Sequence, residues 1–541
     1  MTKNGKELLF VALGGSGEIG MNLNLYGCDG KWLIVDMGVT FGNADYPGID
    51  IIMPDTAFIE ERKRDLVGIL LTHGHEDHIG AVAYLAADLG VPLYANAFTA
   101  GLVSRKLAEE KLDKKVELKI VGLTQKFVLG PFAIELLPLA HSIPDMCAAV
   151  ISTPYGRVFH TGDWKLDDDP ELGYPHAEAA VRPFGDSGIL ALVCDSTNVF
   201  NAEPSGSEGS VRAGLLEVIG EAKGRVVVTT FASNAGRLQT LGEVAKACGR
   251  ELCVAGRSFD RIIEVAQASG HLKKLPRVID WDTAMSLPRH KVMIVATGGQ
   301  GEPRAALARI AEGGHPIKLE RGDRVVYSSK QIPGNEIAIG RIMNQLAERG
   351  IETVTEKQAH IHVSGHPGKP ELKAMYDWVR PALLLPVHGE MRHMLEQARW
   401  GKACGIPETL VQKNGQLVRL APGPAAIIGE VQSGRLILDG DMIVPAEGGG
   451  IAERRRLSQT GYVVVAVHGN EADVVQRGLP VDADDADAFI AEAIAGAEAA
   501  AKSGVSGEKR REAIRLAVRR IATDWTGKKP LVDVLLFETT A

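Results

Sequence analysis

The stretch "LVGILLTHGHEDHIGA", Leu66 to Ala81, crowds metal-binding residue types at the end of an apolar run. The apolar part, Leu66–Leu71, predicts a short buried strand that stops at Thr72. Five ionisable side chains then follow within six positions: His73, His75, Glu76, Asp77 and His78. Imidazole nitrogens and carboxylate oxygens are ligands of zinc, and also of manganese and iron. The loop at the end of this strand is therefore predicted to bind metal.

Four of these side chains are spaced so that two metal ions can share the loop. His73 and His75 can point at one ion, while Asp77 and His78 point at a neighbouring one. Four ligands within six residues cannot easily serve a single tetrahedral ion without strain, so we expect two divalent ions per chain. Zn²⁺ is the expected metal and Mn²⁺ is the alternative.

Three more candidate ligands stand where other predicted strands end. His141 follows "AIELLPLA", Asp163 follows "RVFHTG" and His388 follows "ALLLPV". A carboxylate such as Asp163 can bridge two cations with one oxygen on each. The first site is predicted as His73, His75, His141 and Asp163, and the second as Asp77, His78, Asp163 and His388. Asp36, which ends "KWLIVD", is predicted to hold a ligand histidine in place, whereas His160 lacks such neighbours and is expected to be a core residue.

The composition predicts a soluble, multidomain, cytoplasmic protein. A chain of 541 residues is too long for one core, so two to four domains are expected. Its six cysteines are scattered without a CxxC pair, which fits a reducing compartment and excludes a thiolate zinc site. The N-terminus lacks the apolar region of a signal peptide, and no apolar stretch is long enough to span a bilayer. We therefore expect no membrane partner.

The formal net charge of −8 argues mildly against a nucleic-acid partner, because such partners usually require a basic surface. Net charge averages over all faces, however, and basic residues do gather locally at 61–64, 453–456 and 508–520. A solvated helix face is the simpler explanation of each of these three clusters.

The pattern of apolar residues divides the chain into several parts. Residues 7–200 contain mostly short strands and tight turns, whereas 207–355 repeat a strand–loop–helix rhythm typical of a parallel α/β domain. The later "ALLLPVHGEMRHMLEQARW" resumes the first pattern, so the parallel domain is interpreted as an insertion. The expected order is a first domain at 1–206, the insertion at 207–358, a return segment at 359–430, a turn-rich linker at 431–456 and a small α+β domain at 457–541.

The glycine motif "GSGEIG", Gly15–Gly20, matches the GxGxxG pattern of dinucleotide-binding turns. Such a turn must open a helix whose N-terminus faces a pyrophosphate. Residues 22–26 instead alternate polar and apolar side chains, which predicts a strand. We therefore exclude a dinucleotide site here.

The loop "THGHEDHIGA" resembles the signature of the metallo-β-lactamase superfamily. Six later motifs resemble, in order, those of the β-CASP nucleases and among them the bacterial ribonuclease J family: "TFASNAGRLQ", "GRS", "ATGGQGEP", "IPGNE", "HVSGH" and "PVHGE". The resemblance covers nearly the whole chain. It implies a metallo-β-lactamase αββα sandwich with an inserted parallel α/β β-CASP domain and a small α+β C-terminal domain.

The resemblance also implies roles for particular residues. The acid of the first β-CASP motif falls on Asp195, the histidine of the second on His366, and that of the third on His388, a position where RNA-directed members carry histidine. The segment that binds the substrate phosphate falls on His362, Val363, Ser364, Gly365 and His366. Relatives also suggest a homodimer or homotetramer through the C-terminal domain, and some hold a calcium near the segment that matches 48–50.

Two positions depart from the family pattern. Many members have serine where this chain has Gly299, and Gly-Ser where it has Pro367-Gly368. Both departures concern the expected phosphate pocket and leave the metal ligands unchanged.

These residues suit hydrolysis of single-stranded RNA. A hydroxide shared by two cations is the expected nucleophile, oriented by Asp77 or Asp195, and His366 is the expected general acid for the leaving 3′ oxygen. Ser233 and Asn234, where a strand gives way to a helix, are expected to bind a terminal phosphate together with Ser364. Such a pocket predicts a 5′-to-3′ exonuclease that prefers 5′-monophosphate RNA and also cleaves internally.

Two other functions were weighed against this one. An inactive RNA-binding subunit of a degradation complex should have lost ligands, and all seven are present. A small-molecule hydrolase of the same superfamily would need neither the insertion of about 150 residues nor the C-terminal domain.

Overall fold

The computed structural model describes residues 6–175, 177–332 and 334–537. The chain forms two compact units. The first contains the described residues up to Thr40 and Met53–Gly434, and the second contains Phe41–Ile52 and the residues from Arg435 onward.

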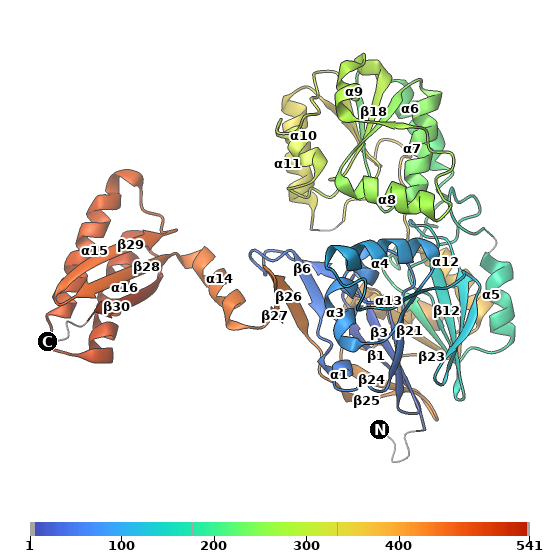
Figure 1. Cartoon of the computed structure of the whole chain (residues 1–541), viewed down its shortest axis with the longest axis horizontal. Helices are drawn as coiled ribbons and strands as arrows, with labels where there is room; N and C mark the ends of the chain where they lie inside the picture. The colour runs from blue at the N-terminus through green and yellow to red at the C-terminus, as the bar shows by residue number, and fades with distance from the viewer. Residues whose placement is uncertain (1–5, 176, 333, 538–541) are drawn as a thin grey trace. The chain divides into compact units, whose positions relative to one another are not determined.

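Two sheets of the first unit pack face to face and carry helices outside them (Figure 1). The first sheet has the order β25-β24-β1-β3-β4-β7-β8-β9 and the second the order β10-β11-β12-β13-β14-β21-β23. The strands of the first sheet are β1 (Leu8–Gly14), β3 (Leu23–Cys28), β4 (Lys31–Val35), β7 (Leu66–Leu70), β8 (Leu93–Ala95), β9 (Leu118–Ile120), β24 (Gln416–Ala421) and β25 (Ala426–Glu430). Those of the second are β10 (Lys126–Leu129), β11 (Phe132–Pro138), β12 (Cys147–Thr153), β13 (Gly156–His160), β14 (Ala191–Asp195), β21 (Leu383–Val387) and β23 (Glu408–Thr409).

A dry core holds these two sheets together. Phe10, Tyr26 and Leu33 from the first sheet meet Phe132 and Ile151 from the second, and all five are fully or almost fully buried. On the outside, α4 (Ala97–Glu109) contacts β8 and β9 beside α3 (Val82–Leu89). The outer face of the second sheet is covered by α5 (Ala177–Asp186), α12 (Lys369–Val379) and α13 (Met391–Ala403). This is the αββα sandwich that the resemblance to the metallo-β-lactamase superfamily implied.

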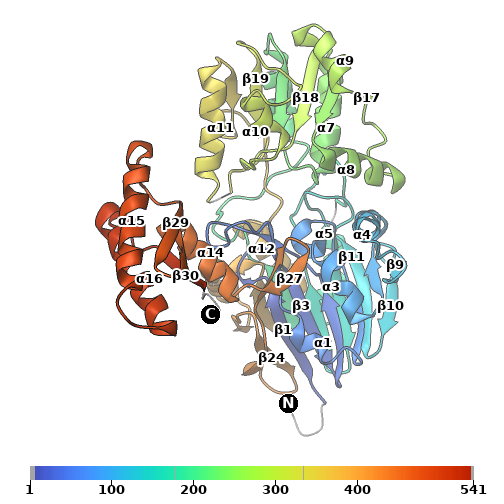
Figure 2. The ribbon, with the colours of Figure 1, turned by 60° about the vertical axis from the view of Figure 1, so that its left-hand side comes forward.

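The inserted domain is a six-stranded parallel sheet of order β17-β16-β18-β15-β19-β20 with helices on both faces (Figure 2). Its strands are β15 (Val226–Thr229), β16 (Glu251–Ala255), β17 (Val278–Ile279), β18 (Val292–Ala296), β19 (Arg324–Tyr327) and β20 (Glu352–Val354). One face packs α6 (Val211–Gly220), α7 (Ala235–Ala247) and α8 (Arg257–Ala268), and the other packs α9 (Trp281–Ser286), α10 (Ala306–Ala311) and α11 (Glu336–Glu348). The predicted parallel α/β insertion is confirmed.

The glycine motif opens no helix. Ser16 and Gly17 form the short strand β2 (Ser16–Gly17), which pairs with β22 (Gly389–Glu390), and β3 follows directly. A side chain at Gly14 would meet the carbonyl oxygen of Met21 at 1.8 Å, so the turn requires glycine there. The strand predicted after the motif is confirmed, and the turn leads to Asn22, whose Nδ2 donates to the carbonyl oxygen of Asp77.

The second unit contains more regular structure than the sequence predicted. The stretch expected as a linker, 431–456, includes β26 (Arg435–Asp439), β27 (Met442–Pro445) and most of α14 (Gly449–Thr460). The strands β26 and β27 pair as a hairpin and join a small sheet with β5 (Thr40–Phe41) and β6 (Ile51–Pro54). This pairing involves segments nearly 400 positions apart, which local turn residues cannot reveal.

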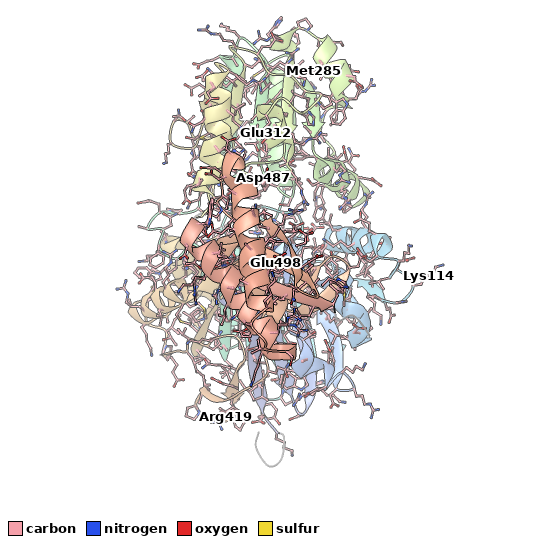
Figure 3. All side chains as sticks on the ribbon, turned by 90° about the vertical axis from the view of Figure 1, so that its left-hand side faces the viewer. Lys114, Met285, Glu312, Arg419, Asp487 and Glu498 are labelled. Carbon is pink, nitrogen blue, oxygen red and sulfur yellow. The ribbon has the colours of Figure 1, made fainter. Side chains whose placement is uncertain are left out.

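The end of the chain is an α/β layer with its own core. The sheet order is β29-β28-β30, with β28 (Tyr462–His468), β29 (Glu471–Arg477) and β30 (Leu531–Phe537). The helices α15 (Ala486–Ala501) and α16 (Gly507–Thr526) cover one face, and Figure 3 labels Asp487 and Glu498 along α15. The strand β29 was not predicted, because its many polar residues obscure the alternation of apolar side chains that indicates a strand. Within the described residues, no helix is long and apolar enough to cross a membrane.

Candidate metal centre

The predicted ligands meet at one edge of the sandwich because each follows the end of a strand. His73 and His75 follow β7, and Asp77 and His78 lie in the single turn α2 (Glu76–Ile79) that comes next. Among the described residues, three groups have ligand atoms within 4.8 Å of one another. They are His73, His75, His141 and Asp163; Asp77, His78, Asp163 and His388; and Asp163, Asp195, His366 and His388. The first two are the two predicted sets, and the third was not predicted.

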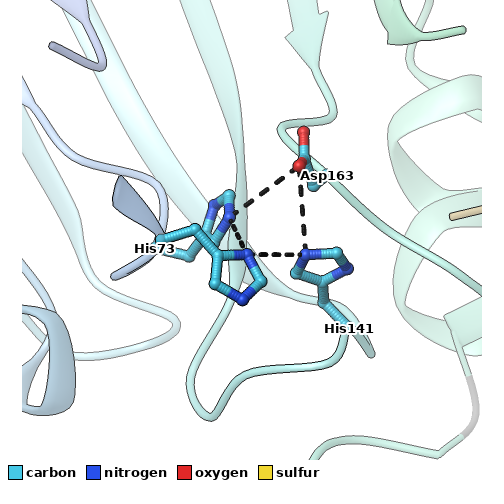
Figure 4. Close-up of side chains that lie close together, drawn as sticks. His73, His141 and Asp163 are labelled. Carbon is cyan, nitrogen blue, oxygen red and sulfur yellow. Dashed lines mark hydrogen bonds and ion pairs between the residues drawn. The ribbon is translucent and has the colours of Figure 1, made fainter. Parts of the chain in front are cut away.

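The first group is a triangle of imidazole nitrogens beneath a carboxylate (Figure 4). Nδ1 of His75 lies 3.0 Å from Nε2 of His73 and 3.1 Å from Nε2 of His141. The Oδ2 atom of Asp163 lies 3.9 Å from the same two Nε2 atoms. These four side chains converge on one small buried space.

In His73 and His141, the ring nitrogen that faces away from the other ligands makes a hydrogen bond, and this bond shows which nitrogen carries the proton. Nδ1 of His141 donates to the carbonyl oxygen of Gly365 at 2.7 Å, so its Nε2 carries a lone pair. Nδ1 of His73 lies 3.0 Å from Oγ1 of Thr72, which itself donates to Asp36, so His73 donates outward as well. The inner nitrogens of His73 and His141 therefore carry lone pairs directed at the same space, an arrangement that a bound cation stabilises. The donor set fits a divalent metal.

The second group is built the same way. Nδ1 of His78 donates to Oδ2 of Asp36 at 2.7 Å, which leaves Nε2 of His78 directed at Asp163. Oδ2 of Asp163 lies 3.2 Å from Nε2 of His78 and 3.3 Å from Nε2 of His388, while Asp77 is 3.6 Å and 3.7 Å from the same two nitrogens. Asp163 thus faces both groups, and its Oδ1 is buried without a hydrogen-bond partner. A carboxylate in this position suits a bridge between two cations.

The electrostatics of the metal-free centre differ between the two groups. Burial, followed by the neighbouring histidines, holds the pKa of His73 well below its usual value, and burial lowers the pKa of His75 to about 3. Burial also disfavours the charged form of His78, but Asp163 and Asp77 outweigh it and raise its pKa well above the usual value. The pKa of His388 is raised in the same way, against burial, by Asp163. Burial would raise the pKa of Asp163, but His388 and His78 hold it well below its usual range.

The sequence analysis did not assign a role to Asn22. Its Nδ2 donates to the carbonyl oxygen of Asp77 at 3.1 Å and lies 3.0 Å from Nε2 of His78. Its Oδ1 lies 3.0 Å from Nδ1 of His388. One buried amide therefore touches three members of the second group. In the sequence, Asn22 is only a polar residue at the start of an apolar strand. That pattern is too common to indicate a role at a metal site.

Asp195 and His366 form a pair next to the metal ligands. Oδ2 of Asp195 accepts a hydrogen bond from Nδ1 of His366 at 2.7 Å. Burial would lower the pKa of His366, but the Asp195 carboxylate outweighs burial and raises it to about 9. The loop after Asp195 secures the pair, because Thr197 donates to the carbonyl oxygen of His388 at 2.8 Å and Asn198 donates to that of His366 at 3.3 Å.

The residues predicted to bind phosphate lie in two loops. In one, the Ser364 hydroxyl accepts from the backbone N–H of His366 at 3.1 Å, Val363 is buried, and Gly365 supports His141. In the other, the Asn234 side chain caps α7 by accepting from the backbone N–H of Arg237 at 2.8 Å, with Ser233 partly exposed beside it.

Positive charges surround the first of these loops. Burial and the nearby Arg237, Lys330 and Lys165 lower the pKa of His362 to about 3. Arg237, which the sequence analysis missed, is fully buried and donates to Glu208, Ser328 and the carbonyl oxygen of Ile361. It ties α7 of the insertion to the segment that precedes His362.

Comparison with known proteins agrees with this architecture. Three family models match: a β-lactamase superfamily domain at residues 46–185, a ribonuclease J β-CASP domain at 223–346, and a Zn-dependent metallo-hydrolase RNA specificity domain at 353–410. A solved protein of unknown function from Enterococcus faecalis V583 shares the fold with a TM-score of 0.55 at 16% identity, over 76% of this chain and 100% of its own. The sandwich, its metal-binding edge and the insertion define a metallo-β-lactamase-type hydrolase of the β-CASP group.

Curated relatives narrow the class to one family. A ribonuclease J of Sinorhizobium meliloti is 43% identical over 98% of this chain and 97% of its own. The ribonuclease J of Thermus thermophilus is 34% identical over 98% of this chain and 95% of its own length. That of Mycolicibacterium smegmatis is 37% identical over 96% of this chain and 95% of its own length. The chain belongs to the ribonuclease J family.

Proposed function

We propose that this protein is a metal-dependent ribonuclease that degrades single-stranded RNA from the 5′ end, prefers a 5′-monophosphate, and also cleaves internally. The observation that carries the proposal is the convergence of all seven predicted ligands, with Asp163 facing both groups. Relatives named ribonuclease J and the match to an RNA specificity domain support RNA as the substrate. We assign two divalent ions to the two predicted sets, Zn²⁺ first and Mn²⁺ as the alternative.

Two divalent cations, when bound, would neutralise the phosphoryl oxygens and supply a water of lowered pKa. Asp77 and His78, with His388, would hold one cation, and His73, His75 and His141 the other. Asp36, Asn22 and Gly365 orient the ligand rings through the hydrogen bonds that they accept.

His366 is proposed as the general acid. Its Nδ1–H is engaged by Asp195, so the proton available for transfer is on Nε2. Asp195 stabilises the imidazolium and fixes the direction of the ring. During cleavage Nε2 of His366 would give its proton to the leaving 3′ oxygen, and solvent would later restore it. Asp77, whose side chain is partly exposed, and Asp195 are the candidates for orienting the attacking water.

The phosphate pocket is proposed between the two loops. Ser233 offers a hydroxyl proton, and Ser364 would turn toward a phosphate the hydroxyl proton that it now gives to the carbonyl oxygen of His366. The Asn234 amide nitrogen is available because its oxygen already caps α7. Of the positive charges near His362, Arg237 and Lys165 are paired with Glu208 and Asp167, so Lys330 is the one that would favour an anion there. A terminal monophosphate needs one such pocket, whereas a triphosphate adds charge and bulk. An internal segment of RNA that passes the pocket without being bound in it would be cleaved endonucleolytically.

The domain boundaries and the assembly are also proposals. We keep 1–206, 207–358, 359–430 and 457–541 as the folding modules, with 431–456 as a structured connection. The uncovered face of the C-terminal sheet carries exposed Val475, Leu535 and Phe537, which supports a homodimer or homotetramer formed through this domain. Free cysteines, four of them buried, fit a cytoplasmic location.

One experiment tests the proposed function. Purified holoenzyme is given RNAs of one sequence with a 5′-monophosphate, a 5′-triphosphate or a 5′-hydroxyl, labelled at either end, and the products are resolved over time. Nucleoside 5′-monophosphates released progressively from the 5′ end of the monophosphorylated RNA are expected. Failure to cleave any of the three RNAs would overturn the ribonuclease assignment, and release from the 3′ end would overturn the proposed direction.

A further inference from the structure

The loop that follows Asp195 leads from the catalytic centre to an exposed aromatic ring. Thr197 and Asn198 bind the backbone of His388 and His366, so the loop is held against both catalytic segments. Val199 is fully buried, but the next side chain, Phe200, is 53% exposed. A phenyl ring this exposed gains little from folding, because most of its apolar surface stays in water.

Phe200 sits on the first turn of α13, the helix that begins just after His388. Its ring is edge-on to that of His393 at 5.2 Å, and the guanidinium of Arg392 lies 5.9 Å from its centroid. Arg392, Leu395 and Arg399 are exposed and are spaced so that they share one face of the helix. An aromatic ring and an amphipathic, basic helix face therefore continue outward from the metal centre.

The charge of this surface is opposite in sign to that of the whole chain. The helix α13 carries three cations, Arg392, Arg399 and Lys402, and one carboxylate, Glu396, and a second carboxylate, Glu390, stands at its N-cap. Glu390 pairs with Arg392 at 2.6 Å, and Glu396 pairs with both Lys369 and Arg399. The helix and its N-cap therefore have an excess of one positive charge, while the chain as a whole carries −8. A polyanion is therefore attracted here and not by the average surface.

We propose that Phe200 and the Arg392–Leu395–Arg399 face of α13, together called the Phe200 platform, bind single-stranded RNA outside the metal centre. A base stacks on the Phe200 ring, and Arg392 and Arg399 meet backbone phosphates. Stacking plus cationic side chains is the combination that binds single strands without reading their sequence. The inference rests on the proposed ribonuclease function and adds to it a binding surface that only longer substrates reach.

The test compares short and long substrates. The holoenzyme and its Phe200→Ala variant are assayed for kcat/KM on a 5′-phosphorylated dinucleotide and on an oligonucleotide of about 12 residues, within the roughly 4–16 nucleotides that such surfaces occupy. The ratio of kcat/KM for the long substrate to that for the dinucleotide should fall about 5- to 150-fold, the equivalent of 1–3 kcal/mol per stacked base. The conservative variant Phe200→Trp should keep the ratio within about twofold of wild type, because indole also stacks.

Two further variants complete the design. Trp281→Ala is the matched control, since Trp281 is also exposed and edge-on to a histidine, His315, at 5.2 Å, but follows the edge strand β17. It should leave the ratio unchanged. Arg392→Gln should reduce the slope of log KM against log salt by about 0.7 for the long substrate, because one phosphate contact is lost.

The outcomes separate the platform from the ribonuclease function. An equal loss of kcat/KM on both substrates would mean that Phe200 supports the metal centre, and the platform would be rejected. No loss on either substrate would reject it too, and would leave a protein partner as the explanation of the exposed surface. If the wild-type enzyme cleaves neither RNA, the failure lies with the proposed function and not with the platform.

Discussion

Oδ1 of Asn22 lies 3.0 Å from Nδ1 of His388, a residue 366 positions later in the chain. The amide orientation is determined by its other side, because Nδ2 must donate to the carbonyl oxygen of Asp77. Oδ1 is therefore an acceptor, and Nδ1 of His388 must carry the proton. This one amide holds a proton on Nδ1 of His388, so Nε2, which faces Asp163 at 3.3 Å, is the nitrogen that a cation would take.

Replacing Asn22 should weaken one metal site and spare the other. In Asn22→Ala the His388 ring loses its orienting acceptor, and the affinity of the second site should fall about 10- to 100-fold. Titration of the apoprotein against a competing chelator measures this directly. Asn414→Ala is the control, since Asn414 binds Ser16 and Glu18 of the same glycine turn without touching a ligand. Unchanged stoichiometry and affinity in Asn22→Ala would contradict the role.

Metal binding should be more sensitive to pH at the second site than at the first. His78 and His388 have raised pKa values in the metal-free protein, so they hold protons that a cation must displace. Affinity at this site should therefore rise as pH rises through those pKa values and fall in acid. His73, His75 and His141 have lowered pKa values and are already neutral near pH 7, so the first site should respond less.

Calorimetry of the apoprotein in buffers of different ionisation enthalpy would count the protons released. About two ions per chain are expected, and His75→Ala should lose one. A single ion in a fully loaded preparation would contradict the two-site arrangement, as would equal proton release at both sites.

His366→Ala should lower turnover by about 10²- to 10⁴-fold, the usual contribution of a general acid, without loss of metal. If metal is lost, the group formed by Asp163, Asp195, His366 and His388 is a ligand set, and the acid has been misassigned.

Asp195→Asn gives an independent measurement of the same pair. A general acid works only while protonated, so activity should fall as pH rises through the pKa of His366. Removing the carboxylate that raises this pKa should move the falling limb of the pH–rate profile to lower pH. Bound cations also lower this pKa, so the comparison is made between fully metal-loaded enzymes. If the falling limb of the pH–rate profile does not move in Asp195→Asn, the Asp195 carboxylate does not raise the pKa of a general acid at His366.

Ser364→Phe should block the proposed phosphate pocket and depress exonuclease activity more than endonuclease cleavage. The Ser364 hydroxyl lies 3.1 Å from the backbone nitrogen of His366, so a large ring there occupies the space of a terminal phosphate. Ser210→Phe, at a hydroxyl that bonds His360 before the pocket segment, is a suitable control. Equal rates of the wild-type enzyme on mono- and triphosphorylated RNA would contradict the pocket.

Arg237→Met should destabilise the protein by about 3–5 kcal/mol, because it leaves the carboxylate of Glu208 buried without its partner. Arg212→Met is the matched control, since Arg212 is more exposed and its pairs with Glu171 and Glu243 should contribute no more than about 1 kcal/mol. Chemical denaturation measures both. A double variant with Glu208→Gln should recover part of the loss, and a loss of under about 1 kcal/mol in Arg237→Met would contradict the buried ion pair.

The sequence by itself predicted the architecture and the residues of the candidate metal centre. The strand–loop–helix rhythm predicted the parallel insertion, because each element must bury one face, and the resemblance of the motifs to the β-CASP nucleases implied the sandwich. The ligands could be chosen because each stands at the end of an apolar run, and strand ends in a sandwich of this kind gather at one edge. His73, His75, Asp77 and His78 were adjacent in the chain, so their meeting required no knowledge of the fold.

Only the tertiary structure decided which atoms of the candidate ligands face one another and what holds them. The roles of Asn22 and Arg237 depend on partners up to hundreds of positions away, and neither residue type indicates a role on its own. The strands and helix at 435–460 formed where turn residues predicted a linker, because β26 finds its partner near residue 51. Hydrogen bonds and strand pairs form between residues that are distant in the chain and close in the fold. The local sequence indicates only which secondary structure each residue prefers.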